Sequence, residues 1–206
     1  MSDKSHGTLY IFSAPSGAGK TSLVTALIEQ TDKLIVSVSH TTRAKRDGEM
    51  DGTHYHFIDV AAYQQMVKAD VFVEHAQVFD NFYGTSQRAL EEKLSEGVDV
   101  ILEIDWQGAR QVRERMPATS VFILPPSKAA LRERLQGRGT DSDDIIDRRM
   151  NDAISEMQHY GEYDYIVVND DFDTALAEIR AIVISSRLHE SRQKAHLAPL
   201  LAQLLA

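Results

Sequence analysis

Two apolar segments of the chain are joined by the stretch Ala14-Pro15-Ser16-Gly17-Ala18-Gly19-Lys20-Thr21. The segment before it, Leu9-Tyr10-Ile11-Phe12, favours a β-strand, and the segment after it, Leu23 to Ile28, has apolar residues at helical spacing. A strand, a turn that contains glycines and a helix, in this order, are the context of a phosphate-binding loop. The alternative is an ordinary turn between a strand and a helix.

The two glycines of this stretch allow the backbone to turn without clashes of a Cβ atom. Successive N–H groups then point inward at a polyphosphate that lies on the positive end of the helix. In such loops Lys20 reaches the β- and γ-phosphates, and the hydroxyl of Thr21 is a ligand of Mg²⁺. The usual pattern begins with glycine, whereas this chain has Ala14 at that position.

Composition narrows the class of protein. The chain of 206 residues suits one domain, or one core with inserted lobes. It has no cysteine, which excludes disulfides, thiolate metal sites and a cysteine nucleophile. Its apolar runs are far shorter than a membrane span, and its first residues are polar. We therefore expect a cytoplasmic protein that does not bind a membrane.

The formal net charge of −9 argues against a general nucleic-acid-binding protein, because such proteins usually display a basic face. Phosphate ligands must therefore be met by local basic clusters. Two such clusters are present, Arg43, Lys45 and Arg46, then Arg132, Arg134, Arg138, Arg148 and Arg149. A solvated helix face is the alternative interpretation of the second cluster.

The order of the expected elements predicts an α/β protein. The expected strands of its core are residues 9–12, 34–38, 98–104, 120–124 and 165–168. Helices are expected between them, and parallel neighbouring strands need such crossover connections. We therefore predict a mainly parallel sheet with helices on both faces. A long helix from about Asp173 is expected to close the chain.

Two segments interrupt this α/β pattern. Residues 39–85 combine a basic loop with the pattern of a β-hairpin, which predicts a small antiparallel lobe. Farther on, Gly137-Arg138-Gly139 separates two helical patterns, which predicts a helical hairpin with an arginine-rich tip. No flexible linker is visible, so we expect both segments to be mounted on one core.

Further motifs make the sequence similar to the guanylate kinase family along nearly its whole length. The phosphate loop is joined by Ser37 to Arg43 with Arg46, Gly48, Glu49, Gly52 and Tyr55, by Phe72 to Ala76, Asn81 to Thr85, Ile104 to Gly108, Arg134 to Gly139 and Val168 to Asp171. The resemblance implies a core of residues 1–38, 86–130 and 158–206, a GMP-binding lobe at 39–85 and a lid at 131–157. It also implies transfer of the γ-phosphoryl group of ATP to GMP in purine nucleotide metabolism.

The resemblance implies roles for single residues as well. The residues implied for the GMP phosphate are Arg43, Arg46, Tyr55 and Tyr83, and those for guanine are Ser39, Glu74, Thr85 and Glu103, the last of which is aspartate in many relatives. Those implied for ATP are Ala14 to Thr21, Arg138 and Asn169. Those implied for catalysis are Lys20, Arg43, Arg134, Arg138 and Arg149. Thr21 would hold Mg²⁺, and Asp105 would orient a water on it or, alternatively, cap a helix.

Other classes of function are less consistent with the residues. Guanylate-kinase-like modules of scaffold proteins bind protein ligands without catalysis, but they typically lose parts of the phosphate loop, and Gly19, Lys20 and Thr21 are present here. A regulatory GTPase would need an Asn-Lys-x-Asp element, which the sequence lacks. The amphipathic end, Leu197 to Leu204, suits either a contact between two copies of the chain or packing within one.

Overall fold

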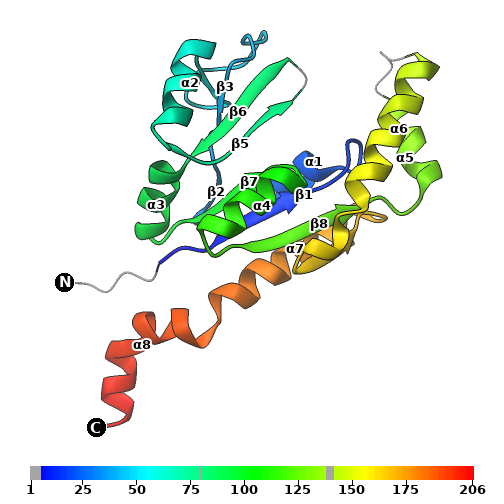
Figure 1. Cartoon of the computed structure of the whole chain (residues 1–206). Helices are drawn as coiled ribbons and strands as arrows, with labels where there is room; N and C mark the ends of the chain where they lie inside the picture. The colour runs from blue at the N-terminus through cyan, green and yellow to red at the C-terminus, as the bar shows by residue number, and fades with distance from the viewer. Residues whose placement is uncertain (1–5, 79, 138–141) are drawn as a thin grey trace.

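The structure is a computed structural model that describes residues 6–78, 80–137 and 142–206 (Figure 1). Its centre is a five-stranded sheet in the order β2-β7-β1-β8-β9, and all neighbouring strands are parallel. The strands are β1 (Leu9–Ser13), β2 (Leu34–Val36), β7 (Asp99–Glu103), β8 (Thr119–Leu124) and β9 (Tyr165–Val168). The predicted parallel sheet is confirmed.

Helices cover both faces of this sheet, as expected. The first layer consists of α1 (Lys20–Glu29) and α7 (Phe172–Arg187), and the second of α3 (Gln87–Ser95) and α4 (Trp106–Arg115). Side chains of a strand alternate between faces. Tyr10 and Phe12 of β1 therefore pack against the first layer, and Leu9 and Ile11 pack against the second. Because β1 is buried on both faces, the loop that follows it starts from a rigid position.

A second, smaller sheet lies in the inserted lobe, in the order β4-β3-β6-β5. Its elements are β3 (His40–Thr41), β4 (His56–Phe57), α2 (Val60–Lys68), β5 (Phe72–Val78) and β6 (Asn81–Ser86). The expected hairpin of β5 and β6 is antiparallel, as is the pair of β3 and β6. However, β3 and β4 are parallel, because the loop between them leads the chain back to the starting end of β3 before β4 begins. The lobe is therefore not antiparallel throughout.

The predicted helical hairpin consists of α5 (Lys128–Gln136) and α6 (Asp143–Met157). These helices form a small core of their own around Leu131, Leu135, Ile146 and Met150. The expected arginine-rich tip, which includes Arg138, lies outside the described residues. In Figure 1 the lobe and the hairpin stand apart from each other above the central sheet.

The chain closes with two helices rather than the one that we predicted. Helix α7 ends at Arg187, and α8 (Glu190–Leu204) begins after His189, whose backbone is extended with φ −58° and ψ 138°. A short 3₁₀ turn, Tyr160–Glu162, precedes β9. Figure 1 shows α8 pointing away from the core, and Leu200, Leu201 and Leu204 are exposed. A contact of this segment between two copies of the chain, one of the two roles that its sequence suits, stays a prediction.

Candidate active site

The backbone of the phosphate loop has the conformation that its two glycines indicate. Gly17 and Gly19 have φ values of 91° and 90°, in the left-handed region that glycine favours. A Cβ at Gly19 would lie 2.4 Å from Nδ2 of Asn169, so no larger residue fits there. Ala14 does not have a positive φ, which explains why alanine is tolerated at this position.

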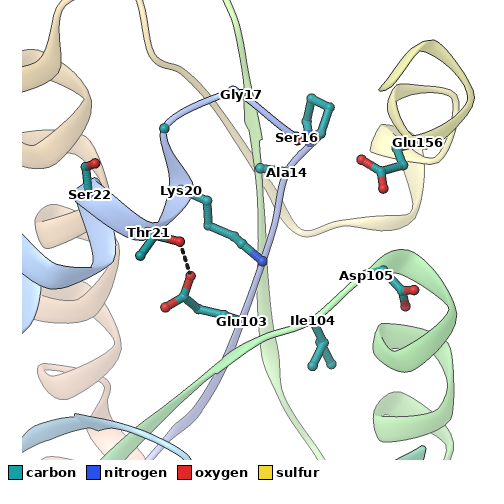
Figure 2. A pocket seen from close by; sticks show the side chains of 12 residues that line it. Ala14, Ser16, Gly17, Lys20, Thr21, Ser22, Glu103, Ile104, Asp105 and Glu156 are labelled. Carbon is teal, nitrogen blue, oxygen red and sulfur yellow. Dashed lines mark hydrogen bonds between the residues drawn. The ribbon is translucent and has the colours of Figure 1, made fainter. Parts of the chain in front are cut away.

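Lys20 lies in a pocket of about 340 Å³ that the phosphate loop surrounds. Glu103, Asp105 and Glu156 form the opposite wall, and Figure 2 shows these side chains around the cavity. Burial lowers the pKa of Lys20 below its ordinary value, and the negative charges of the three carboxylates oppose this shift without cancelling it. The pocket therefore places one ammonium group among carboxylates, next to the backbone that is expected to bind phosphate.

Thr21 and Glu103 are joined at the floor of this pocket. The hydroxyl of Thr21 donates a hydrogen bond of 3.2 Å to Oε2 of Glu103 (Figure 2). Asp105 caps α4, because its Oδ1 accepts from the N–H of Gly108 at 2.8 Å. The cap that we gave as an alternative for Asp105 is thus present. The water-mediated role of Asp105 stays a prediction.

The donor set at this floor fits Mg²⁺. A hydroxyl and carboxylates are oxygen ligands of the kind that Mg²⁺ prefers, and this ion usually keeps several waters and binds substrate phosphates besides. Among the residues that the structure describes, no group of three or more His, Asp or Glu side chains forms a metal site by itself. A single protein ligand at Thr21 is consistent with a metal that arrives with its nucleotide.

A second pocket, of about 580 Å³, adjoins the first and shares Lys20, Thr21, Glu103 and Asp105 with it. Its other wall comes from the inserted lobe. The expected GMP residues that line it are Ser39, Tyr55, Glu74, Tyr83 and Glu103. The structure thus places a second site beside the phosphate loop, between the core and the lobe.

Three of the four residues expected at guanine are connected by hydrogen bonds. The hydroxyl of Thr85 donates to Oε1 of Glu74 at 2.5 Å, and it shares a hydrogen bond of 3.0 Å with the hydroxyl of Ser39. Glu74 is only 4% exposed, and burial raises the pKa of its carboxyl group. The fourth residue, Glu103, is bonded to Thr21 instead. The reading of guanine by these side chains stays a prediction.

The two arginines expected at the GMP phosphate are held by Glu49. Arg43 donates to Oε1 of Glu49 at 2.6 Å, and the backbone N–H of Arg46 donates to Oε2 at 2.8 Å. The hydrogen bond from Arg43 lowers the pKa of Glu49. The guanidinium of Arg43 also lies 5.5 Å from the ring centre of Tyr55, and this ring is 6.0 Å from that of Tyr83.

The hairpin reaches the phosphate loop through two of the expected lid arginines. Arg149 of α6 donates to the hydroxyl of Ser16 at 2.7 Å. Arg134 of α5 donates to the carbonyl of Asn169 at 2.9 Å, and the amide of Asn169 donates to the carbonyl of Ala18 at 2.7 Å. These contacts connect the hairpin, the loop and the end of β9.

Two residues of the site were not assigned from the sequence. Glu49 is part of a recognised motif, and its position shortly after Arg43 and Arg46 was a usable signal. No signal in the sequence indicated Glu156, because glutamate is common on amphipathic helices. Its Oε2 is buried without a hydrogen-bond partner, and burial raises its pKa. Trp106 of α4 stacks on His159 with ring centres 3.7 Å apart.

A parallel sheet, a phosphate loop and two adjoining pockets define the class of P-loop nucleotide-binding proteins with a second substrate site. The family model for guanylate kinase matches residues 6–186. Guanylate kinases of Photorhabdus laumondii subsp. laumondii and Escherichia coli K12 are 59% and 56% identical, each over 97% of this chain and 98% of the relative. The solved guanylate kinase of Anaplasma phagocytophilum is 34% identical, with a TM-score of 0.74 over 92% of this chain and 90% of that chain. The chain belongs to the guanylate kinase family.

Proposed function

We propose that the chain transfers the γ-phosphoryl group of ATP to GMP and releases ADP and GDP. The observation that carries this proposal is membership of the guanylate kinase family, with relatives of that name 56% to 59% identical over nearly the whole chain. The two adjoining pockets are consistent with it, because a phosphotransferase must hold donor and acceptor side by side.

The reaction makes modest chemical demands on the protein. A nucleoside monophosphate has a second pKa of about 6, so near neutral pH its phosphate oxygen is already an anionic nucleophile. No general base is required. The requirement is to align two polyanions and to cancel their repulsion with cationic groups. Lys20, which lines both pockets, supplies this charge together with arginines that contact lining residues, Arg149 at Ser16 and Arg43 at Glu49.

ATP occupies the first pocket in this proposal. The backbone of residues 14–21 and the ammonium of Lys20 bind its phosphates, and Asn169 lies beside the adenine. Arg134 and Arg149, with Arg138, approach the transferring phosphoryl group from the lid. Arginine suits this task because its planar fork forms paired hydrogen bonds to phosphate oxygens. Thr21 would hold Mg²⁺, which would supply positive charge to the phosphates.

GMP occupies the second pocket. Arg43, Arg46, Tyr55 and Tyr83 hold its phosphate. Ser39, Glu74, Thr85 and Glu103 surround the base, and Glu74 accepts from the two donors that guanine presents side by side. The lobe and the lid close over both nucleotides, which keeps water from intercepting the γ-phosphoryl group.

An ADP-release assay with a panel of nucleoside monophosphates tests the function. We expect release of ADP to depend on the acceptor, with GMP the best. Lys20→Met, a change of similar length, is expected to reduce kcat by about 10² or more, because a fixed cation on the transferred phosphate is lost. Release of ADP that is independent of the acceptor would contradict the proposal.

The cytoplasm is the proposed location. The absence of cysteine suits a reducing compartment. In the described part of the chain, no helix combines the length and the apolar character that a membrane crossing requires. A homo-oligomer through α8 is proposed as well, and the sedimentation of the full chain against one that ends at Arg187 tests it.

A further inference from the structure

Helix α4 lies along the outer edge of the lobe's sheet. Strand β5 is the last strand in the order β4-β3-β6-β5, so one row of its backbone groups has no neighbouring strand. Helix α4 contacts β5 or its side chains through Gly108, Gln111 and Arg115, among other residues. These positions are three and four residues apart and therefore share one face of the helix.

The carboxamide of Gln111 takes the place of a missing strand at His75. Its Oε1 accepts from the backbone N–H of His75 at 3.0 Å, and its Nε2 donates to the carbonyl of the same residue at 3.0 Å. A primary amide can do both at once because it carries an acceptor and a donor side by side, as a peptide group does. Arg115 adds a hydrogen bond of 3.3 Å to the carbonyl of Phe72. Helix α4 thus holds the backbone of β5 on both sides of Glu74.

The carboxylate of Glu74 lies against the first turn of the same helix. A Cβ at Gly108 would be only 3.1 Å from Oε2 of Glu74, while Thr85 donates to Oε1 from β6. The pairing of β5 with β6 is shifted between Phe72 and Glu74, so regular strand pairing does not fix the direction of this side chain on its own. The contacts from α4 therefore contribute to the position of the carboxylate.

We propose that Gln111 is a positioning residue for guanine recognition, because its clamp on the backbone of His75 holds the Glu74 carboxylate in place against α4. The inference rests on the proposed function and on the role of Glu74 in it. Gln111 lines neither of the two pockets, so it acts through Glu74 rather than on a nucleotide. It also ties the lobe, which carries β5, to the core, which carries α4.

The test is Gln111→Met, which keeps the length of the side chain and removes both hydrogen bonds. We expect the KM for GMP to rise about tenfold, with kcat and the KM for ATP changed by less than about twofold. The preference for GMP over AMP in kcat/KM should narrow. Glu114→Met is the matched control, since Glu114 is exposed on the same helix, and it should leave all of these values unchanged.

The selectivity for GMP over AMP distinguishes a positioning role of Gln111 from a merely structural one. A variant with a lower melting temperature but an unchanged KM for GMP and an unchanged GMP-to-AMP ratio would overturn the inference. If Gln111→Met does not fold, Gln111→Glu keeps the acceptor for the N–H of His75 and replaces the donor with an anionic oxygen that repels the carbonyl of His75. The same two readouts then decide. A wild-type chain that does not prefer GMP would overturn the proposed function as well, whereas a selective wild type with an equally selective variant overturns this inference alone.

Discussion

The hydroxyl of Thr21 donates to the carboxylate of Glu103 at the point where the two pockets meet. This hydrogen bond connects the first turn of α1 with the last residue of β7. It places a negative charge beside the residue expected to hold Mg²⁺. Glu74, in contrast, has its hydrogen bond with Thr85 in the lobe. The charge of Glu103 should therefore act on the metal more than on the base.

Glu103→Gln tests this relationship, since it keeps an acceptor for Thr21 and removes the charge. We expect the Mg²⁺ concentration for half-maximal activity to rise by about tenfold, as is common when a group that supports a metal ligand is changed. The measurement is the initial rate against Mg²⁺ at fixed ATP. A KM for GMP that rises instead, at saturating Mg²⁺, would support the contact with guanine that the sequence predicts.

Glu74→Gln tests the reading of the base. Guanine presents two donors, N1–H and the N2 amine, whereas the variant offers one acceptor and one amine. Each hydrogen bond to a charged group contributes about 1.5 to 3 kcal/mol, so GMP binding should weaken strongly. The ratio of kcat/KM for GMP to that for AMP should fall. An unchanged ratio would mean that Glu74 does not contact the base.

The same substitution should stabilise the protein without nucleotide. Burial raises the pKa of Glu74 above its ordinary value of 4.5, so the folded chain binds this proton more tightly than the unfolded chain does. The resulting stabilisation is present below the ordinary pKa and is lost as the pH rises through the raised value. Glu74→Gln should therefore match the wild type near pH 4 and gain about 0.5 to 2 kcal/mol at neutral pH. Urea unfolding at both pH values measures this difference.

Arg149→Ala should act on turnover rather than on the binding of GMP. Arg149 belongs to α6 of the hairpin and contacts Ser16 of the phosphate loop. We expect kcat to fall by about 10², as for other groups that stabilise charge in the transition state, with the KM for GMP changed by less than about threefold. Arg148→Ala is the control, because the neighbouring arginine is exposed. An effect on the KM for GMP alone would contradict the placement of Arg149 in the lid.

The sequence predicted the core sheet well because its strands are short apolar segments between strong turn signals. Strand β4 has only two residues, and its parallel pairing with β3 depends on the path of the loop between them, so this pairing could not be predicted. The break between α7 and α8 also left no local signal, since neither Leu188 nor His189 is a strong helix breaker. Instead, Asp99, which is distant in the sequence, contacts both helices at this break.

Sequence motifs indicate candidate residues of the site, but they do not indicate which other residues these contact. The phosphate loop and the arginines belong to recognisable motifs. Most of the loop lines the first pocket, whereas the described arginines line neither pocket; Arg149 contacts Ser16 of the first, and Arg43 contacts Glu49 of the second. The bond of Glu103 with Thr21 depends on the register of β7 beside β1, which a single sequence does not reveal. Glu156 enters the site only because α6 folds back over the loop.

Asp99→Asn should destabilise the fold without changing the chemistry. Asp99 is fully buried at the start of β7, and its two oxygens accept from Arg187 at 2.7 Å and from Arg192 at 2.8 Å. One oxygen also accepts from the N–H of Thr8 at 2.7 Å. Because Arg187 ends α7 and Arg192 lies in the first turn of α8, this carboxylate holds the chain across the break between the helices.

Removal of one partner from a buried ion pair leaves the other charges uncompensated, which costs about 3 to 5 kcal/mol. We therefore expect Asp99→Asn to lower the free energy of unfolding in urea by an amount of this order. Asp47→Asn, in an exposed loop, is the control and should change it by less than about 0.5 kcal/mol. At temperatures where the variant is folded, its kcat should equal that of the wild type, because Asp99 lines neither pocket. A loss of stability below about 1 kcal/mol would show that the two arginines find adequate solvation without the carboxylate.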